Sequence, residues 1–148
     1  MAISDVFLVK SLATAGGKLA FAGIAALAET GAARTAIGET GKVGANALAE
    51  LVGGTTNKYF PTGLGRRFVD QFAEGVAHES KVGYTAGTDF VRREAAKDAW
   101  LVMNKDIKSA VWHFSESPVT GLVGPSGPLR DFLTQLGIEI VCPACPVK

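Results

Sequence analysis

RRFVDQFAEGVAHESKVGY, residues 66–84, is the stretch that decides the fold, because two short apolar runs flank the dipeptide Glu74-Gly75. Runs of aromatic and β-branched residues on either side of a two-residue turn that contains Gly are typical of a β-hairpin. A two-residue loop pairs residue 73 with residue 76, which fixes how the strands align. The sequence therefore predicts a hairpin whose strands carry charged residues inside apolar runs.

The register of this hairpin places three charged side chains on one face. Counting outward from the turn puts Asp70 opposite Glu79, and Lys81 lies on the same face because strand side chains alternate. Opposed carboxylates have Cβ atoms about 4.5–5.5 Å apart, so they destabilise the pair unless a cation lies between them. A four-residue loop keeps this register, whereas a three-residue loop places His78 opposite Asp70. The alternative is a solvated face with a weak surface salt bridge, but the apolar neighbours argue against it.

Length and composition limit the class of protein. With 148 residues and 47% hydrophobic content, the chain can form one globular domain with a core but not two of ordinary size. Fifteen basic and fourteen acidic side chains give a formal charge of +1, so no global field attracts nucleic acid or an anionic membrane. Binding of a polyanion therefore requires a local basic patch.

The two ends of the chain carry weak signals. Residues 1–31 are apolar, but Lys10 and Lys18 interrupt them before the roughly 18 apolar residues that a spanning helix needs, so no stable membrane span is expected. The same stretch lacks the basic start of a signal peptide. Cys142 and Cys145 are half of a metal-binding set without a second half, which favours a plain tail or an incidental thiol pair.

A change of composition divides the chain into two predicted parts. Residues 1–58 are rich in Ala and Gly and are expected to form a helical arm or linker. The last helix of this arm, at about residues 42–52, is expected to pack on the domain that follows, because it ends in a Gly pair suited to a helix C-cap. Residues 59–148 hold most of the aromatic side chains and are expected to contain the core.

Strands and helices alternate in this second part. After the hairpin, residues 88–106 have a helical apolar face, and residues 109–115 have the β-branched and aromatic content of a strand. Residues 128–137 predict a helix with Pro128 at its first position, and residues 138–142 predict a short buried strand. The predicted fold class is therefore α/β or α+β, with helices covering a sheet.

Asp70, followed after eight residues by Glu79-Ser80-Lys81, resembles the D…ExK active site of the restriction-endonuclease-like, or PD-(D/E)XK, nuclease superfamily. Residues 42–142 match that superfamily's element order, which is a helix, three strands, a helix and a further strand. Residues 65–98 and 110–138 resemble the C-terminal nuclease domains of bacterial polymorphic toxins. These toxins are delivered at the end of larger contact-dependent or secretion-system proteins.

The resemblance implies two parts and a set of site residues. Residues 1–58 would correspond to a pre-toxin segment and residues 59–148 to the nuclease domain. In that family the carboxylates of the motif, here Asp70 and Glu79, hold Mg²⁺, Mn²⁺ or another divalent cation together with the backbone carbonyl at the position of Ser80. Lys81 orients or helps to deprotonate the attacking water and offsets phosphate charge.

Other charged residues are weaker candidates. The family often adds a Glu from the first core helix to the metal ligands, and Glu50 is the best match, although an exposed helical Glu is the simpler interpretation. Arg92, Arg93 and Lys97 cluster on the helix after the hairpin, and basic side chains of this kind position nucleic acid by its phosphates. The alternative for these three residues is a solvated helix face with an Asp89–Arg93 contact at i,i+4.

The expected function is a metal-dependent endonuclease, a bacterial toxin domain that acts on DNA in the cytoplasm of a target cell. A cognate immunity protein is implied as a partner, because the producing cell needs protection. A tRNA-specific or other RNA nuclease with the same site is the close alternative. A non-catalytic module that binds a membrane or a protein through its Ala-rich arm is the second alternative.

Overall fold

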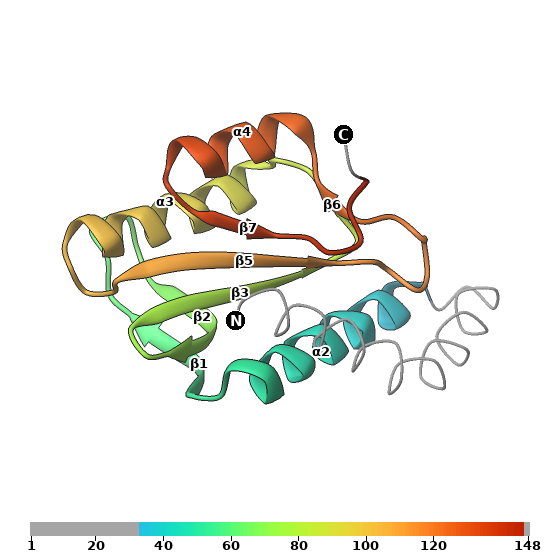
Figure 1. Cartoon of the computed structure of the whole chain (residues 1–148), viewed down its shortest axis with the longest axis horizontal. Coiled ribbons are helices and arrows are strands. Elements are labelled where there is room, and N and C mark those ends of the chain that lie inside the picture. Colours follow the sequence, from blue (N-terminus) through green and yellow to red (C-terminus); the bar gives the residue numbers. More distant parts are fainter. Residues whose placement is uncertain (1–32, 147–148) are drawn as a thin grey trace.

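A five-stranded mixed sheet organises the molecule, whose structure is a computed structural model that describes residues 33–146, with side chains from residue 41 onward (Figure 1). The strands lie in the order β1-β2-β3-β5-β7, with neighbours antiparallel up to β3 and with β5 and β7 parallel to it. They are β1 (Thr55–Phe60), β2 (Arg67–Ala73), β3 (Val76–Val82), β5 (Ser109–Ser115) and β7 (Glu139–Val141). Two short strands, β4 (Tyr84–Thr85) and β6 (Gly124–Pro125), form a separate parallel pair.

Within residues 33–146, three helices cover the sheet. The helix α2 (Ala33–Val52) lies on one side, and α3 (Asp89–Met103) and α4 (Gly127–Gln135) lie on the other (Figure 1). The predicted α+β class is therefore confirmed, and so are the predicted helices and strands after the hairpin. None of the helices within residues 33–146 has the length and apolar character needed to cross a membrane.

The first described helix is longer than its prediction. It ends at Val52, as expected for the helix predicted at about residues 42–52, and Gly53 follows with φ of 68°. It contacts β2 and β3 closely, since a Cβ atom on Gly44 would lie 2.6 Å from Val82 Cγ2. The strand β1 comes next and spans the boundary placed at residue 58. The other helices predicted in the arm, within residues 1–31, lie outside the described residues.

The hairpin between β2 and β3 has the predicted turn. Glu74 and Gly75 both have positive φ, 52° and 82°, which is the type I′ geometry that suits the twist of antiparallel strands. Ala73 pairs with Val76 in this hairpin, so the predicted two-residue loop is confirmed. A register slip of one residue would exchange the two faces of β3, and this turn prevents it.

The strand β2 changes face near Asp70. Strict alternation would place Val69 and Phe72 on opposite faces, because they are three residues apart. Both pack into the same core cluster on the α3 and α4 side of the sheet. Asn57 of β1, which lies opposite Asp70, has a φ of 53°. The pairing between β2 and β3 ends at Gln71 with His78, so it does not extend to Asp70. The strand is therefore locally irregular at the residue that the sequence singled out, as is common next to functional sites.

The main core lies between the sheet and the helices α3 and α4. Fully buried side chains from both layers meet there, namely those of Val69, Ala95, Leu101, Trp112, Phe114, Leu129 and Leu133. Each of the Val, Leu and Phe side chains in this set contributes roughly 1.5–3 kcal/mol when it is removed from water. This packing fixes α3 against β2, β3 and β5 and so determines which charged side chains of α3 meet the hairpin.

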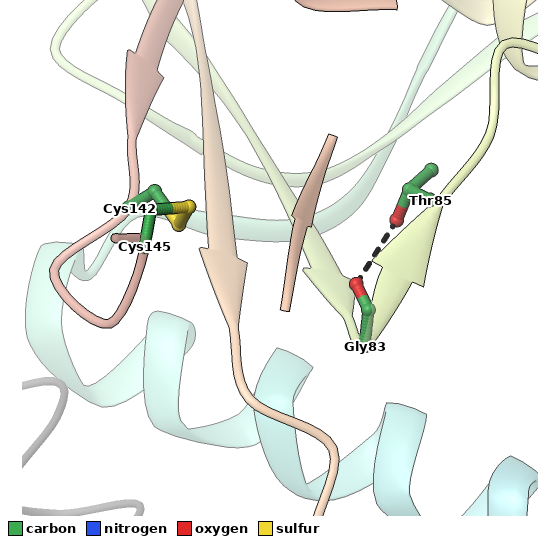
Figure 2. The surroundings of a disulfide bond; sticks show 4 residues. All are labelled: Gly83, Thr85, Cys142 and Cys145. Atoms are coloured by element: carbon green, nitrogen blue, oxygen red, sulfur yellow. Dashed lines mark hydrogen bonds between the residues drawn. A yellow bond between two sulfur atoms is a disulfide. The ribbon is translucent and has the colours of Figure 1, made fainter. Parts of the chain in front are cut away.

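Cys142 and Cys145 form a disulfide in the turn after β7, as Figure 2 shows. The bond spans a short loop with a Cα–Cα distance of 5.4 Å, and Cys145 Sγ would be 2.6 Å from a Cβ atom on Gly124 of β6. Gly124 has φ of 92°, so both its conformation and this close approach require glycine. The cysteines are thus part of the packed end of the domain rather than a plain tail.

The glycine in the hairpin turn provides a test of the register. We expect Gly75→Ala to lower the free energy of unfolding by about 1–2 kcal/mol, because Ala is strained at a φ of 82°. Gly41→Ala is a matched control in α2, where nothing lies within 4 Å of the added methyl group and Ala should stabilise the helix by about 1 kcal/mol. Urea denaturation of both variants measures the difference, and an equal response at the two sites would contradict the assigned turn.

Candidate functional site

Glu79 and Lys81 lie on β3 and face α3 together, as their spacing predicts. Lys81 Nζ lies 2.9 Å from Glu79 Oε2, and only 5% of the Glu79 residue is exposed. Lys81 Nζ also lies 5.1 Å from the ring centre of Trp112 on the neighbouring strand β5. The acid and the base of the ExK motif are therefore held in a largely buried environment, where their charges interact more strongly than at the surface.

Arg67 is the centre of the charges around this pair. Its guanidinium is 4% exposed, and Nη2 lies 3.0 Å from Glu79 Oε1. On the other side, Nε lies 2.7 Å from Asp98 Oδ1 of α3, and Trp112 Nε1 donates to Asp98 Oδ2 at 2.9 Å. Burial alone would lower the pKa of Arg67, but the Asp98 hydrogen bond and the surrounding carboxylates raise the pKa above its ordinary value. Arg67 thus stays charged and fixes the position of Glu79.

Glu94 of α3 closes a ring of alternating charges. One oxygen lies 3.3 Å from Arg67 Nη1, and the other lies 2.8 Å from Lys81 Nζ. The ring runs from Arg67 to Glu79, Lys81, Glu94 and back to Arg67. Burial raises the pKa of Glu94, as does the charge of Glu79, while Lys81 and Arg67 oppose that effect. Every charged group in this ring therefore has two neighbours of opposite sign.

Arg67, Glu94 and Asp98 were not among the site residues expected from the sequence. A usable signal was present, because Glu94 and Asp98 are four residues apart and flank the buried Ala95 on one face of α3. Two carboxylates at the edge of an apolar helix face indicate a buried cation opposite them. No comparable signal identified Arg67, since its partners are 12, 27 and 31 residues away in sequence.

Asp70 lies next to this ring and touches the backbone of the ExK motif. Its Oδ2 accepts a hydrogen bond from the backbone N–H of Ser80 at 2.8 Å. Burial raises the pKa of Asp70 to about 6, and the nearby charge of Glu79 contributes to the rise. Lys81 and Arg67 act in the opposite direction. Asp70 therefore lies near Glu79 and Lys81 and contacts Ser80, but the predicted direct pairing of Asp70 with Glu79 is not formed, because the β2–β3 pairing ends at Gln71 with His78.

Glu50 is not part of this group. It is an exposed residue of α2, which covers the side of the sheet opposite to α3 (Figure 1). Within residues 41–146, no cluster of three or more His, Cys, Asp and Glu side chains is arranged to hold a metal ion. The carboxylates available near the motif are those of Asp70 and Glu79, with Glu94 bound to the two cations of the ring.

The two carboxylates fit a magnesium ion in their chemistry. Hard oxygen ligands suit Mg²⁺, which takes few protein carboxylates and keeps several waters. The pKa of Asp70 is raised in part by the charge of Glu79, and a cation held by both groups would relieve that repulsion. Both Glu79 oxygens already contact a cationic side chain, so an ion would share or replace the Lys81 contact at Oε2.

The three basic residues predicted to bind nucleic acid point in different directions along α3. Arg92 lies over the ring of Phe132 on α4, with 5.5 Å between its guanidinium carbon and the ring centre. Arg93 Nε donates to the backbone carbonyl of Asp89 at 3.4 Å. Lys97 Nζ donates to the backbone carbonyl of Arg66 at 3.0 Å, beside the start of β2. Arg92 and Arg93 are therefore exposed in different surroundings, and Lys97 is half-buried at the start of the hairpin.

His78 and His113 form a second polar pair, on the face opposite to Glu79. His78 Nδ1 lies 2.9 Å from His113 Nε2, which requires one ring to donate its proton to the other. Burial lowers the pKa of His78, and burial together with the neighbouring His78 lowers the pKa of His113 to about 4. The pair is therefore neutral at pH 7 and separate from the charged ring. The predicted alternation of His78 away from Glu79 is confirmed.

Comparison with protein-family models, with curated proteins and with solved structures found no match to this chain. The function must therefore be argued from the geometry of the hairpin and the ring of charges beside it.

The buried arginine gives a direct stability test. We expect Arg67→Met to lower the free energy of unfolding by about 3–5 kcal/mol, because Glu79 and Asp98 would remain buried without their cation. Its neighbour Arg66 is exposed and provides the matched variant Arg66→Met, which should change stability by less than about 0.5 kcal/mol. Chemical denaturation measures both variants. Similar losses at the two positions would show that the ring does not hold β2 to α3.

The raised pKa of Asp70 predicts a pH dependence. The neutral carboxyl is favoured in the folded state, so the stabilisation from Asp70 is complete below its ordinary pKa of 3.8 and is lost as the pH rises through about 6. NMR titration of the Asp70 carboxyl carbon, without divalent cations, should give a midpoint near pH 6. Glu79→Gln should lower that midpoint, because it removes a repelling charge, whereas Glu50→Gln should leave it in place. A wild-type midpoint below 5 would contradict the described environment.

Proposed function

We propose that this protein is a metal-dependent nuclease that hydrolyses phosphodiester bonds, with DNA as the favoured substrate and tRNA or other RNA as the close alternative. The observation that carries the proposal is the convergence of two carboxylates and an amine on adjacent strands. Lys81 Nζ lies 2.9 Å from Glu79, and the Asp70 carboxylate accepts the N–H of the residue between them.

The topology supports the same proposal. The described chain follows the order helix, three strands, helix and strand, with β5 parallel to β3. This is the order that the resemblance to the restriction-endonuclease-like superfamily implies. The motif lies on the second and third strands of that order, at the residue where β2 becomes irregular. Local irregularities of this kind are common next to active sites, where they change the direction of a side chain.

The chemistry divides among the residues of the motif. Asp70 and Glu79 would hold the divalent cation, with the Ser80 carbonyl beside them, and the cation supplies positive charge at the phosphate and a water of lowered pKa. Burial would lower the pKa of Lys81, but Glu79 and Glu94 raise it above its ordinary value. Lys81 therefore stays protonated at pH 7. In this arrangement Lys81 offsets phosphate charge and orients water, rather than acting as the base.

The toxin assignment is part of the proposal. Residues 1–58, rich in Ala and Gly, precede the nuclease segment as a pre-toxin stretch does in the proteins that this sequence resembles. We infer delivery from a bacterial producer as part of a larger protein and action in the cytoplasm of the target cell. A cognate immunity protein that blocks the site would protect the producer.

A cleavage assay tests the proposed function. Purified protein is incubated with plasmid DNA and with total tRNA, in Mg²⁺, Mn²⁺ or EDTA. We expect the protein to cleave at least one of these substrates in Mg²⁺ or Mn²⁺. We expect EDTA to abolish that cleavage. Lys81→Ala and the nearly isosteric Asp70→Asn should each reduce the rate by about 10²–10³-fold, the usual loss when one charge-stabilising group is removed from an active site.

The control for this assay is Asp131→Asn, which changes an exposed carboxylate of α4 and should keep the wild-type rate. Thermal melting of each variant establishes that it is folded. If the wild-type protein cleaves neither substrate in Mg²⁺ or Mn²⁺, the proposed enzymatic function is refuted. Full cleavage activity in Lys81→Ala would contradict the assigned site, whereas undiminished toxicity of Glu79→Ala would favour the non-catalytic interaction module.

A further inference from the structure

Tyr59 and Phe68 form an exposed aromatic pair on the hairpin of β1 and β2. They are directly paired across the two strands, and their ring centres are 5.2 Å apart with 47° between the planes. Tyr59 is 45% exposed and Phe68 is 47% exposed, whereas the aromatic residues of β5 are buried. Two large rings on an ordered pair of strands thus present nearly half of their surface to solvent.

The irregularity at Asp70 accounts for this exposure. Arg67 points into the ring of charges, and its cross-strand partner Phe60 packs edge-on against Phe72 with ring centres 5.1 Å apart. Tyr59 and Phe68 alternate with these residues and therefore lie on the other face of the sheet. The helix α2 covers that face near the end of β2, where Gln71 contacts the carbonyl of Gly53, and it leaves the two rings exposed.

A band of basic side chains begins beside these rings. Arg66 is two residues before Phe68, and Lys97 reaches across from α3 to the Arg66 carbonyl. Arg93 is one helical turn before Lys97. The side chains of Arg66 and Arg93 are exposed and that of Lys97 is half-buried, and within residues 41–146 none of the three forms a salt bridge. Their charge is therefore available to an anionic partner, although the whole chain has a formal charge of only +1.

The aromatic pair is connected to the candidate active site. Arg67 Nη1 donates to the Phe68 carbonyl at 2.8 Å, and Arg67 Nη2 contacts Glu79. Phe68 and Asp70 are two residues apart, which is about 7 Å along a strand. The ExK side chains face α3 on the opposite side of the sheet, so a ligand bound on the rings would reach them by passing around the end of the hairpin, at Arg66 and Lys97.

We propose that the rings of Tyr59 and Phe68, together with Arg66, Arg93 and Lys97, bind an unpaired nucleic-acid strand and present it to the site at Asp70 and Glu79. Exposed aromatic faces accept bases by stacking, and adjacent cations hold the phosphates. A duplex keeps its bases stacked on one another and offers no base face to the rings. This inference rests on the proposed nuclease and names its substrate class as single-stranded DNA or RNA, including the loops of a folded RNA.

Binding measured without cleavage tests the proposal. Fluorescence anisotropy with the full chain in EDTA compares a labelled single-stranded DNA, the same sequence as RNA, and a blunt duplex. We expect the single strands to bind at least tenfold more tightly than the duplex. Tyr59→Ala/Phe68→Ala should weaken single-strand binding by about ten- to a hundredfold, because stacking on the rings is lost.

Two further variants control for folding and for general aromatic exposure. Tyr59→Leu/Phe68→Leu keeps apolar bulk on the strands and removes only the aromatic faces, so it should lose binding while keeping the melting temperature. Tyr84→Ala changes an aromatic residue of β4 that is 57% exposed, and it should bind as the wild type does. Arg66→Gln should weaken the binding of all the oligonucleotides. It should also reduce the slope of log affinity against log salt concentration by about one.

The outcomes separate this inference from the proposed enzyme. Equal binding of duplex and single strand, or undiminished single-strand binding in both double variants, overturns the inference even if the wild-type protein cleaves DNA. Ring-dependent binding of single strands by a protein that cleaves nothing in Mg²⁺ or Mn²⁺ supports the inference while refuting the nuclease. A surface that binds none of the three oligonucleotides overturns the inference and leaves the rings as a protein-docking site.

Discussion

The buried guanidinium of Arg67 is the interaction on which the rest of the structure depends. It joins β2 to β3 through Glu79 and joins the sheet to α3 through Glu94 and Asp98. A charge at this depth is tolerated only when its partners are fixed around it, because desolvation of an unpaired ion costs several kcal/mol. The packing of α3 supplies those partners, and the ring in turn fixes the orientation of α3. A buried ion cluster adds little to stability compared with apolar packing, but it permits few alternative arrangements.

The same ring limits the candidate site. Glu79 has two roles, since one oxygen holds Arg67 and the other holds Lys81. A divalent cation would therefore compete with Lys81, and Glu94 provides a second carboxylate that keeps the amine in place when Glu79 turns to the ion. Under the proposed function, one cation could thus replace another without leaving a carboxylate unpaired. Such an exchange would allow the fully paired site to take up the proposed metal ion.

Local rules predicted much of the fold and only part of the site. The turn residues, the helices α3 and α4 and the strand β5 follow from patterns within a few residues, and they are present as expected. The strand β1 was missed because TTNKYF is polar and exposed along most of its length, which is unusual for a predicted strand. Arg67 and the His78–His113 pair were missed because their partners are distant in sequence and meet only through tertiary packing.

The change of face in β2 could not be found from alternation, and its consequences are large. Counting back from Phe72, which packs in the core, strict alternation would turn Phe68 inward and Arg67 outward. The structure shows the reverse, with Arg67 buried and Phe68 exposed. One irregular residue position near Asp70 therefore creates both the buried ring of charges and the exposed aromatic pair. The candidate active site is built at this irregularity, because Asp70 is its first carboxylate and Glu79 and Lys81 belong to the ring of charges.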